Sequence, residues 1–161
     1  MESRSPQRRS GSKKVCQDLL QQRARLLLQY CQISDVCVQE NGTTADLLHR
    51  FCQNLVDYVA TGHFALYDRI IKGGERRQRV QYLAKSLYPQ ILESTSKVVS
   101  FSDRYAQSTD HFSLQQDLST LGEVLAGRIS VEDQLLAELV TGLNFSISVP
   151  DDSRPPIPVP T

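Results

Sequence analysis

The chain has 161 residues, which is enough for one domain with a complete hydrophobic core. Lys+Arg and Asp+Glu each number 18, so the formal net charge is zero, which argues against a broad basic surface for nucleic acid. No apolar run approaches the ~20 residues that span a bilayer, and no apolar segment of a signal peptide follows the basic N-terminus. We therefore expect a cytoplasmic protein without membrane contact.

The first part of the chain predicts an arm followed by a helix. Residues 1–12 read MESRSPQRRSGS, and this polar, basic composition predicts a disordered arm. Its arginines could contact phosphate, although a solvated tail is the simpler interpretation. Residues 13–33 predict the first helix, because apolar residues recur there at near-helical spacing. These residues are Val15, Leu19, Leu26, Tyr30 and Ile33. Asp35 and an Asn-Gly pair then predict a loop over residues 34–42.

Residues 43–72 predict the second helix, which stops at two consecutive glycines. At ~100° per residue, seven of its residues share one broad face that should belong to the core. They are Leu47, Phe51, Leu55, Tyr58, Val59, Gly62 and Leu66. Gly62 interrupts the helix at a cost of up to ~1 kcal/mol if it is exposed, so we expect it to allow a close approach by another helix or a bend.

The opposite face of this helix carries an aromatic residue between two acids. Asp57 and Phe64 are i and i+7, and Phe64 and Asp68 are i and i+4, so the three form one ridge with Ile71 beside it. An aromatic anchor rimmed by charge is typical of a protein interface, and the acids favour a basic partner surface, such as one that otherwise binds nucleic acid. The alternative is that Phe64 packs on a neighbouring helix or loop, since single exposed apolar residues are normal.

Two further helices complete the predicted fold. Residues 75–106 predict the third helix, in which Pro89 should produce a kink. Residues 113–143 predict the fourth, which carries a heptad-like stripe of leucines. Four long amphipathic helices with short links predict an all-α fold, an antiparallel up-and-down four-helix bundle with disordered N- and C-terminal tails. The C-terminal tail, residues 144–161, is rich in proline, and its PPIP sequence could be a docking motif or part of a solvated segment.

Two charged residues fall within the leucine stripe of the fourth helix. Arg128 and Glu132 are i and i+4, and the stripe places both on or near the core side. An interior charge must be paired and hydrogen-bonded, because its desolvation costs several kcal/mol. We expect a buried structural ion pair, joined by Tyr58 or His63, with a polar pocket as the alternative. Glu123 projects away from the stripe, toward solvent or a partner.

No catalytic or metal-binding motif is recognisable. The four cysteines form no CxxC pair, so we expect structural thiols at Cys16, Cys31, Cys37 and Cys52 rather than zinc or disulfides. The glycine pair follows a helix rather than a strand, and no Gly-x-Ser-x-Gly sequence occurs. Asp46-x-x-His49 is only one of the two motifs that a di-iron bundle needs. We therefore expect no enzymatic activity, no cofactor and no metal.

Three stretches of the chain are distinctive when taken together. The first is FCQNLVDYVATGHFALYDRI in the second helix, the second is LYPQILESTS at 87–96, and the third is LGEVLAGRISVEDQLL at 121–136. They resemble the Rsd/AlgQ family, the bacterial regulators of the primary sigma factor of RNA polymerase. The resemblance covers roughly residues 12–143.

The resemblance implies an anti-sigma factor. Such a protein binds the C-terminal domain of the primary sigma factor, the helix-turn-helix that reads the −35 promoter element, and so favours alternative sigma factors. The resemblance assigns partner binding to Asp57, His63, Phe64, Tyr67, Asp68 and Glu123, and a structural role to Arg128 and Glu132. The chain departs from the family in its first helix, where Gln17-Asp18-Leu19 replaces an Asp-Arg-Trp segment and no Trp is present.

Two rival functions stay open at this point. One is a transcription regulator that acts through another protein partner, or through DNA contact by the basic arm. The other is a bundle enzyme or metalloprotein that uses Asp46, His49 and His63. For the leading interpretation we expect no direct contact with nucleic acid, and we favour a monomer.

Overall fold

The computed structural model describes residues 7–39, 44–74, 76–107 and 112–145, nearly all of them in helices. The helices are α1 (Gln7–Gln39), α2 (Thr44–Ala60), α3 (Gln78–Tyr105) and α4 (Leu114–Phe145). Two π-helical segments, η1 (Thr61–Asp68) and η2 (Ile70–Gly74), continue the path of α2. No strand occurs in these ranges, so the predicted all-α class is confirmed.

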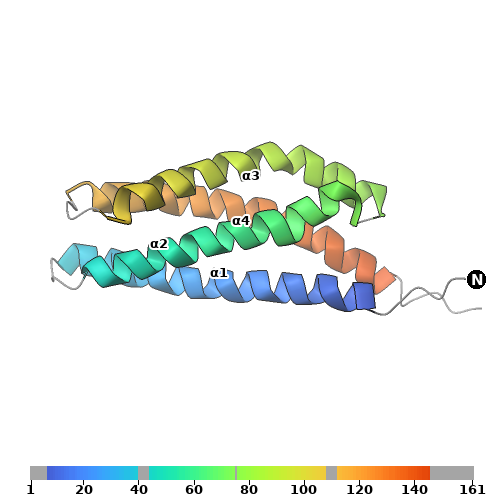
Figure 1. Ribbon diagram of the computed structural model, residues 1–161, viewed down its shortest axis with the longest axis horizontal. Coiled ribbons are helices and arrows are strands. Elements are labelled where there is room, and N and C mark those ends of the chain that lie inside the picture. Colours follow the sequence, from blue (N-terminus) through green and yellow to red (C-terminus); the bar gives the residue numbers. More distant parts are fainter. Residues whose placement is uncertain (1–6, 40–43, 75, 108–111, 146–161) are drawn as a thin grey trace, which may run out of the picture.

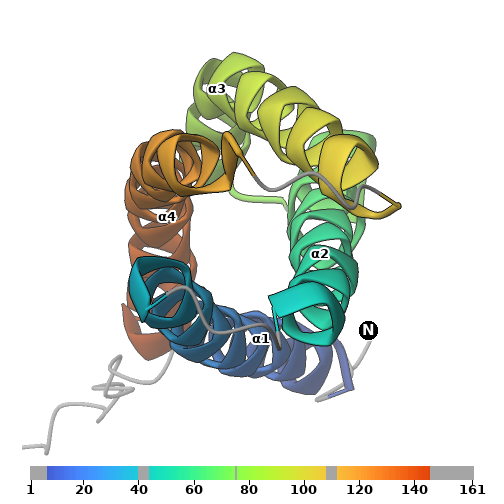
Figure 2. The ribbon, with the colours of Figure 1, turned by 90° about the vertical axis from the view of Figure 1, so that its left-hand side faces the viewer.

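The helices form an antiparallel bundle (Figure 1), as the amphipathic patterns predicted. Seen along the bundle, they follow one another as α1, α2, α3 and α4 around a closed ring, so α2 and α4 lie diagonally opposite each other (Figure 2). The start of α1 and the end of α4 lie at the same end of the bundle (Figure 1). α3 contains Pro89 in its interior and follows an arched path. None of the described helices is long and apolar enough to cross a membrane.

The core forms where the apolar stripes of the four helices meet. On α2 and η1, the predicted core face is buried at Phe51, Leu55, Tyr58, Val59, Gly62 and Leu66, and Leu47 is partly buried against it. On α1, the buried positions alternate by three and four residues, as near-parallel helix packing requires. They are Cys16, Leu19, Arg23, Leu26 and Ile33. Each large apolar side chain that is removed from water contributes roughly 1.5–3 kcal/mol.

The bounds of α1 differ from the prediction at both ends. The helix begins at Gln7, inside the segment predicted as an arm, and it continues to Gln39, through the segment predicted as a loop. Its first turns run alongside η1, and Cys37 near its end packs against the core. Tertiary packing of this kind outweighs weak local loop signals. The predictions for residues 1–6 and 146–161 concern parts of the chain outside the described residues.

The predicted second helix is continuous through Gly74, but its last part is π-helical instead of α-helical. A π-helix has a wider turn than an α-helix and occurs frequently at functional sites. Gly62 lies in the first turn of η1 and is buried. A Cβ atom at this position would lie 3.1 Å from Arg128 Nη2 and 3.1 Å from Glu132 Oε1. Glycine therefore allows the close approach to α4 that we expected here.

Candidate partner-binding site

Phe64 stands out on the outer face of η1. Its side chain is 67% exposed, although most large apolar side chains of the neighbouring turns are buried. Asp57, in the last turns of α2, is exposed, and the Asp68 side chain is 28% exposed. An exposed apolar ring with acidic residues before and after it in the chain is the combination that protein interfaces use: the ring becomes buried on binding, and the acids favour a basic partner.

The carboxylate of Asp68 has a neighbour of opposite charge. Lys72 Nζ lies 2.8 Å from Asp68 Oδ2, one helical turn further along the chain. The hydrogen bond and the charge of Asp68 raise the pKa of Lys72. Because Lys72 is largely exposed, this pair contributes little to stability, but a basic group of a partner must compete with it for Asp68.

His63 connects Phe64 to the third helix. The His63 and Phe64 rings meet edge to face, with centroids 5.0 Å apart, and the His63 and Tyr88 ring centroids are 5.6 Å apart. Tyr88 OH lies 3.5 Å from His63 Nε2. The aromatic surface therefore extends from η1 onto α3. The sequence prediction missed Tyr88, although an aromatic residue beside the apolar stripe of the third helix, next to Pro89, was a usable signal.

Tyr67 lies inside the protein, not on the partner-facing surface to which the family resemblance assigns it. Its side chain is fully buried, and Leu66 and Ile70 are buried beside it. Its hydroxyl has no hydrogen-bond partner within the described part of the chain, and burial raises its pKa. Ile71, expected beside the outer ridge, is partly buried and packs against the core. The π-helical path places these residues inward, where they support the exposed turn.

Glu123 is exposed, but the structure does not bring it together with the ridge. It belongs to α4, which lies diagonally across the bundle from α2 (Figure 2). Residues on the outer faces of diagonal helices point away from each other. A single compact contact therefore does not include both Glu123 and Phe64.

Arg128 and Glu132 form an ion pair at the centre of the bundle, with both side chains fully buried. Arg128 Nε donates to Glu132 Oε1 at 2.8 Å. Arg128 Nη1 donates to Thr95 Oγ1 at 2.9 Å and to Ser94 Oγ at 3.1 Å, and Nη2 donates to the Val59 carbonyl at 3.3 Å. The guanidinium therefore joins α4 to α3 and to the last turn of α2.

The second oxygen of Glu132 joins the remaining helix to this network. Arg23 Nη2 on α1 lies 3.0 Å from Glu132 Oε2, and the hydroxyl of Tyr58 on α2 donates to the same oxygen. Burial and the charge of Glu132 raise the pKa of Tyr58. Arg23 Nη1 also lies 2.6 Å from Asp133 Oδ1. Burial alone would lower the pKa of Arg23, but its bonds to Asp133, Tyr58 and Glu132 raise it.

Arg23 was not predicted, although the sequence held a signal for it. It lies four residues after Leu19 and three before Leu26, so the helical spacing of the first helix predicts an apolar residue at this position. A charge at such a position requires a buried partner. Its partner, however, lies more than 100 residues away on α4, and no local pattern identifies it.

The metal-ligating and thiol side chains of the described residues are dispersed over the bundle. They hold no group of three or more His, Cys, Asp and Glu side chains placed to bind a metal ion. All four cysteines are free. Burial raises the pKa of the Cys52 thiol to about 11 and also raises that of Cys16, so neither is an activated nucleophile near neutral pH.

Comparison with known proteins identifies the family. The family described as "Regulator of RNA polymerase sigma(70) subunit, Rsd/AlgQ" matches residues 2–140. A "Regulator of sigma D" from Yersinia pseudotuberculosis serotype O:1b (strain IP 31758) is 38% identical over 138 residues, which cover 81% of this chain and 82% of the relative. Proteins of the same name from Yersinia enterocolitica serotype O:8 / biotype 1B and from Enterobacter sp. (strain 638) are 38% and 34% identical, with 81% of this chain and 83% of each relative covered.

No solved structure matches the chain. The family match covers more than half of the sequence and includes all three stretches on which the resemblance rests. The chain belongs to the Rsd/AlgQ family of regulators of the RNA polymerase sigma(70) subunit.

Proposed function

We propose that this protein is an anti-sigma factor that binds the C-terminal, −35-element-reading domain of the primary sigma factor. Binding lowers the use of that sigma factor by RNA polymerase and so favours alternative sigma factors. The observation that carries the proposal is the exposed Phe64, which stands in the chain between the acids Asp57 and Asp68. The family match and the relatives named "Regulator of sigma D" supply the partner.

Charge complementarity supports this partner. A helix-turn-helix domain presents basic side chains to the phosphates that flank its recognition helix. The carboxylates of Asp57 and Asp68 are suited to the same basic groups. A sigma domain whose basic surface faces these acids cannot contact promoter phosphates at the same time. This competition is how binding at one surface lowers sigma-factor use.

Phe64 supplies the affinity in this scheme, and its neighbours hold it in place. Burying an aromatic side chain of this size contributes about 2–3 kcal/mol, the scale of an interface hot spot. The edge contact with His63, itself against Tyr88, restricts the Phe64 ring before binding. Tyr67 supports the same turn from the core. Glu123, on α4, would reach a partner only through a second contact.

Calorimetric titration with the purified sigma C-terminal domain tests the proposal. We expect a one-to-one complex, with Phe64→Ala weakening binding by about 30-fold or more. Asp57→Asn should weaken binding several-fold at low salt and less at high salt, since rim charges are screened.

Two variants serve as matched controls for this titration. Tyr82→Ala removes an aromatic ring that is 77% exposed on α3, and Asp103→Asn neutralises an exposed acid near the other end of α3. Both should bind like the wild type. Absence of a wild-type complex would contradict the function. Equal affinities of Phe64→Ala and Tyr82→Ala would contradict the site alone.

A further inference from the structure

The outer side of α1 carries a second apolar face, separate from the face that packs into the core. It consists of Leu20, Ala24, Leu27, Leu28 and Cys31, all of which are exposed. The Leu20 side chain is 46% exposed and that of Leu28 is 67% exposed. The spacing of three and four residues places the set on one side of the helix, about 110° around it from the buried positions. We call this set the outer face of α1.

No charged residue interrupts the outer face of α1 between its ends. Arg23 points into the core, where it is buried and lies 3.0 Å from Glu132 and 2.6 Å from Asp133. Arg25 lies about 120° around the helix from the centre of the face. The face is therefore apolar over about three helical turns. Scattered apolar residues are normal on a protein surface, but a row of this kind marks an interaction site.

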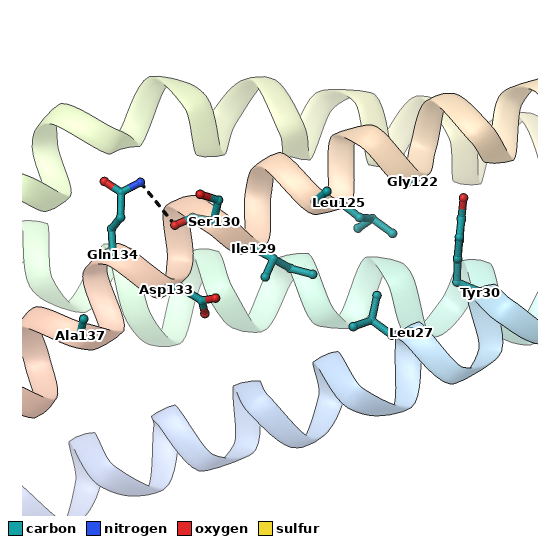
Figure 3. A pocket seen from close by; sticks show the side chains of 10 residues that line it. Leu27, Tyr30, Gly122, Leu125, Ile129, Ser130, Asp133, Gln134 and Ala137 are labelled. Carbon is teal, nitrogen blue, oxygen red and sulfur yellow. Dashed lines mark hydrogen bonds between the residues drawn. The ribbon is translucent and has the colours of Figure 1, made fainter.

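The neighbouring helix leaves room beside this face. Leu27 also contributes to a pocket of about 780 Å³ between α1 and α4 (Figure 3). Polar residues such as Asp133 line that pocket from α4, so the pocket is not part of the apolar face. The exposed α4 residues along it include Ala126, Ser130 and Ala137, whose side chains are small. A helix that lies against the outer face of α1 can therefore approach closely.

Opposite charges stand at the two ends of the outer face. Lys13 and Lys14 precede it, and Asp35 follows Cys31 by about one turn; all three charged residues are exposed. If the faces of two copies met in parallel, the lysines of one copy would lie against the lysines of the other. If they met in antiparallel orientation, the lysines of each copy would lie near Asp35 of the other copy. Charge pairs that flank an apolar seam set the orientation of paired helices, so the antiparallel arrangement is favoured.

We propose that the outer face of α1 pairs with the same face of a second copy of this chain, in antiparallel orientation about a two-fold axis. In such a contact, if one residue faces another, the second faces the first in return. With Leu20 opposite Cys31 of the second copy, Ala24 falls opposite Leu27. Each of these leucines then faces a smaller side chain, which is the combination that lets two helices interdigitate. The proposal differs from the monomer that the sequence favoured.

The same register brings the charged ends together. Lys14 then lies within about 3 Å, measured along the helix axis, of Asp35 of the second copy, and the symmetry repeats this contact at the other end. The contact is short, so we expect a dimer that dissociates on dilution and not an obligate one. The outer face of α1 shares no residue with the surface around Phe64, so the proposed dimer and the proposed sigma-factor binding are tested separately.

Cross-linking of the full-length protein with a short bismaleimide tests the register. Leu20→Cys places a thiol opposite Cys31 of the second copy, so most of this variant should become a covalent dimer. In the wild type, the Cys31 thiols of the two copies are roughly 16 Å apart along the axis, beyond the reach of the reagent, and little dimer should form. Leu92→Cys is the matched control, because Leu92 is a 44% exposed leucine on α3, diagonally across the bundle from α1 (Figure 2). It should give as little dimer as the wild type.

Sedimentation analysis tests the dimer itself. The mass of the wild type should approach that of two chains as the protein concentration is raised. Leu27→Glu should keep the mass of one chain throughout, whereas Leu92→Glu should associate like the wild type. Asp35→Lys should raise the dissociation constant about three- to tenfold at low salt. Adding Lys13→Glu and Lys14→Glu to Asp35→Lys should restore association, because the charges are then exchanged between the two ends.

Three results would overturn the proposal. The first is a wild-type mass of one chain at every concentration, with equal cross-linking of Leu20→Cys and Leu92→Cys. The second is wild-type cross-linking through Cys31 that is as efficient as that of Leu20→Cys, which would indicate a parallel contact. The third is association that Leu27→Glu leaves unchanged, or a loss of sigma-domain binding in Leu27→Glu without any dimer in the wild type, which would assign the outer face to that partner.

Discussion

The guanidinium of Arg128 and the carboxylate of Glu132 form a fully buried ion pair, with Nε and Oε1 2.8 Å apart. The pair belongs to α4, and side chains or carbonyls from the other three helices bond to it. A buried charge that loses its partner retains its full desolvation cost, so the pair couples the position of each helix to the others. The ion pair also lies close to Gly62, where a Cβ atom would approach Arg128 Nη2 and Glu132 Oε1 to 3.1 Å. The pair is therefore coupled to the first turn of η1, which also contains Phe64.

Removing one member of the pair should destabilise the bundle strongly. Arg128→Met leaves Glu132 buried without its main partner, and we expect a loss of about 3–5 kcal/mol in the free energy of unfolding. Urea denaturation monitored by circular dichroism measures this loss. Lys97→Met breaks an exposed pair with Glu93 and should leave stability nearly unchanged, because solvent screens exposed pairs. A loss below about 1 kcal/mol for Arg128→Met would contradict the central role of the pair.

Two glycines should respond in opposite directions to a methyl group. In Gly62→Ala the new Cβ lies 3.1 Å from Arg128 Nη2 and from Glu132 Oε1, so we expect a loss of about 1–3 kcal/mol. In Gly127→Ala no heavy atom outside the local helix lies within 4 Å of the new Cβ, so the higher helix propensity of alanine should raise stability by about 0.5–1 kcal/mol. Thermal unfolding of the two variants compares them directly. Equal shifts of the melting temperature would show that the close contact at Gly62 is relaxed at little cost.

Two buried tyrosines should differ in what their hydroxyls contribute. The hydroxyl of Tyr58 donates to Glu132, so Tyr58→Phe should lower the free energy of unfolding by about 1–3 kcal/mol. The hydroxyl of Tyr67 has no partner among the described residues, so Tyr67→Phe should leave stability unchanged or raise it by about 1 kcal/mol. Chemical denaturation of both variants provides the comparison. A large loss in Tyr67→Phe would indicate a hydrogen bond that the structure does not contain.

Lys72 should weaken the binding of a basic partner, because it already occupies the Asp68 carboxylate. Under the proposed function, Lys72→Ala should tighten the complex with the sigma C-terminal domain by about two- to fivefold at low salt. The gain should shrink near 0.5 M salt, where charge interactions are screened within a few ångströms. Lys97→Ala, which removes a similar exposed pair on α3, is the control and should have no effect. Weaker binding of Lys72→Ala would mean that Lys72 itself contacts the partner.

The sequence by itself determined the four helices, the core face of α2 and the placement of Phe64 opposite that face, whereas the exposure of Phe64 came from the structure. These features follow from the helical repeat, in which residues three and four apart share a face whatever lies elsewhere in the chain. The repeat also placed Arg128 and Glu132 on the core side, because both occupy positions in the fourth helix where the helical spacing of its leucines continues.

Only the tertiary structure decided which residues meet across helices. The π-helical path of η1 turned Tyr67 inward, the ring order of the helices separated Glu123 from Phe64, and contact with α3 brought Tyr88 to His63. The packing of α1 against α4 brought Arg23 to Glu132. The physical cause is common to Glu123, Tyr88 and Arg23. Periodicity fixes the face of a residue on its own helix, whereas its partners depend on how four helices rotate and shift to fill one core.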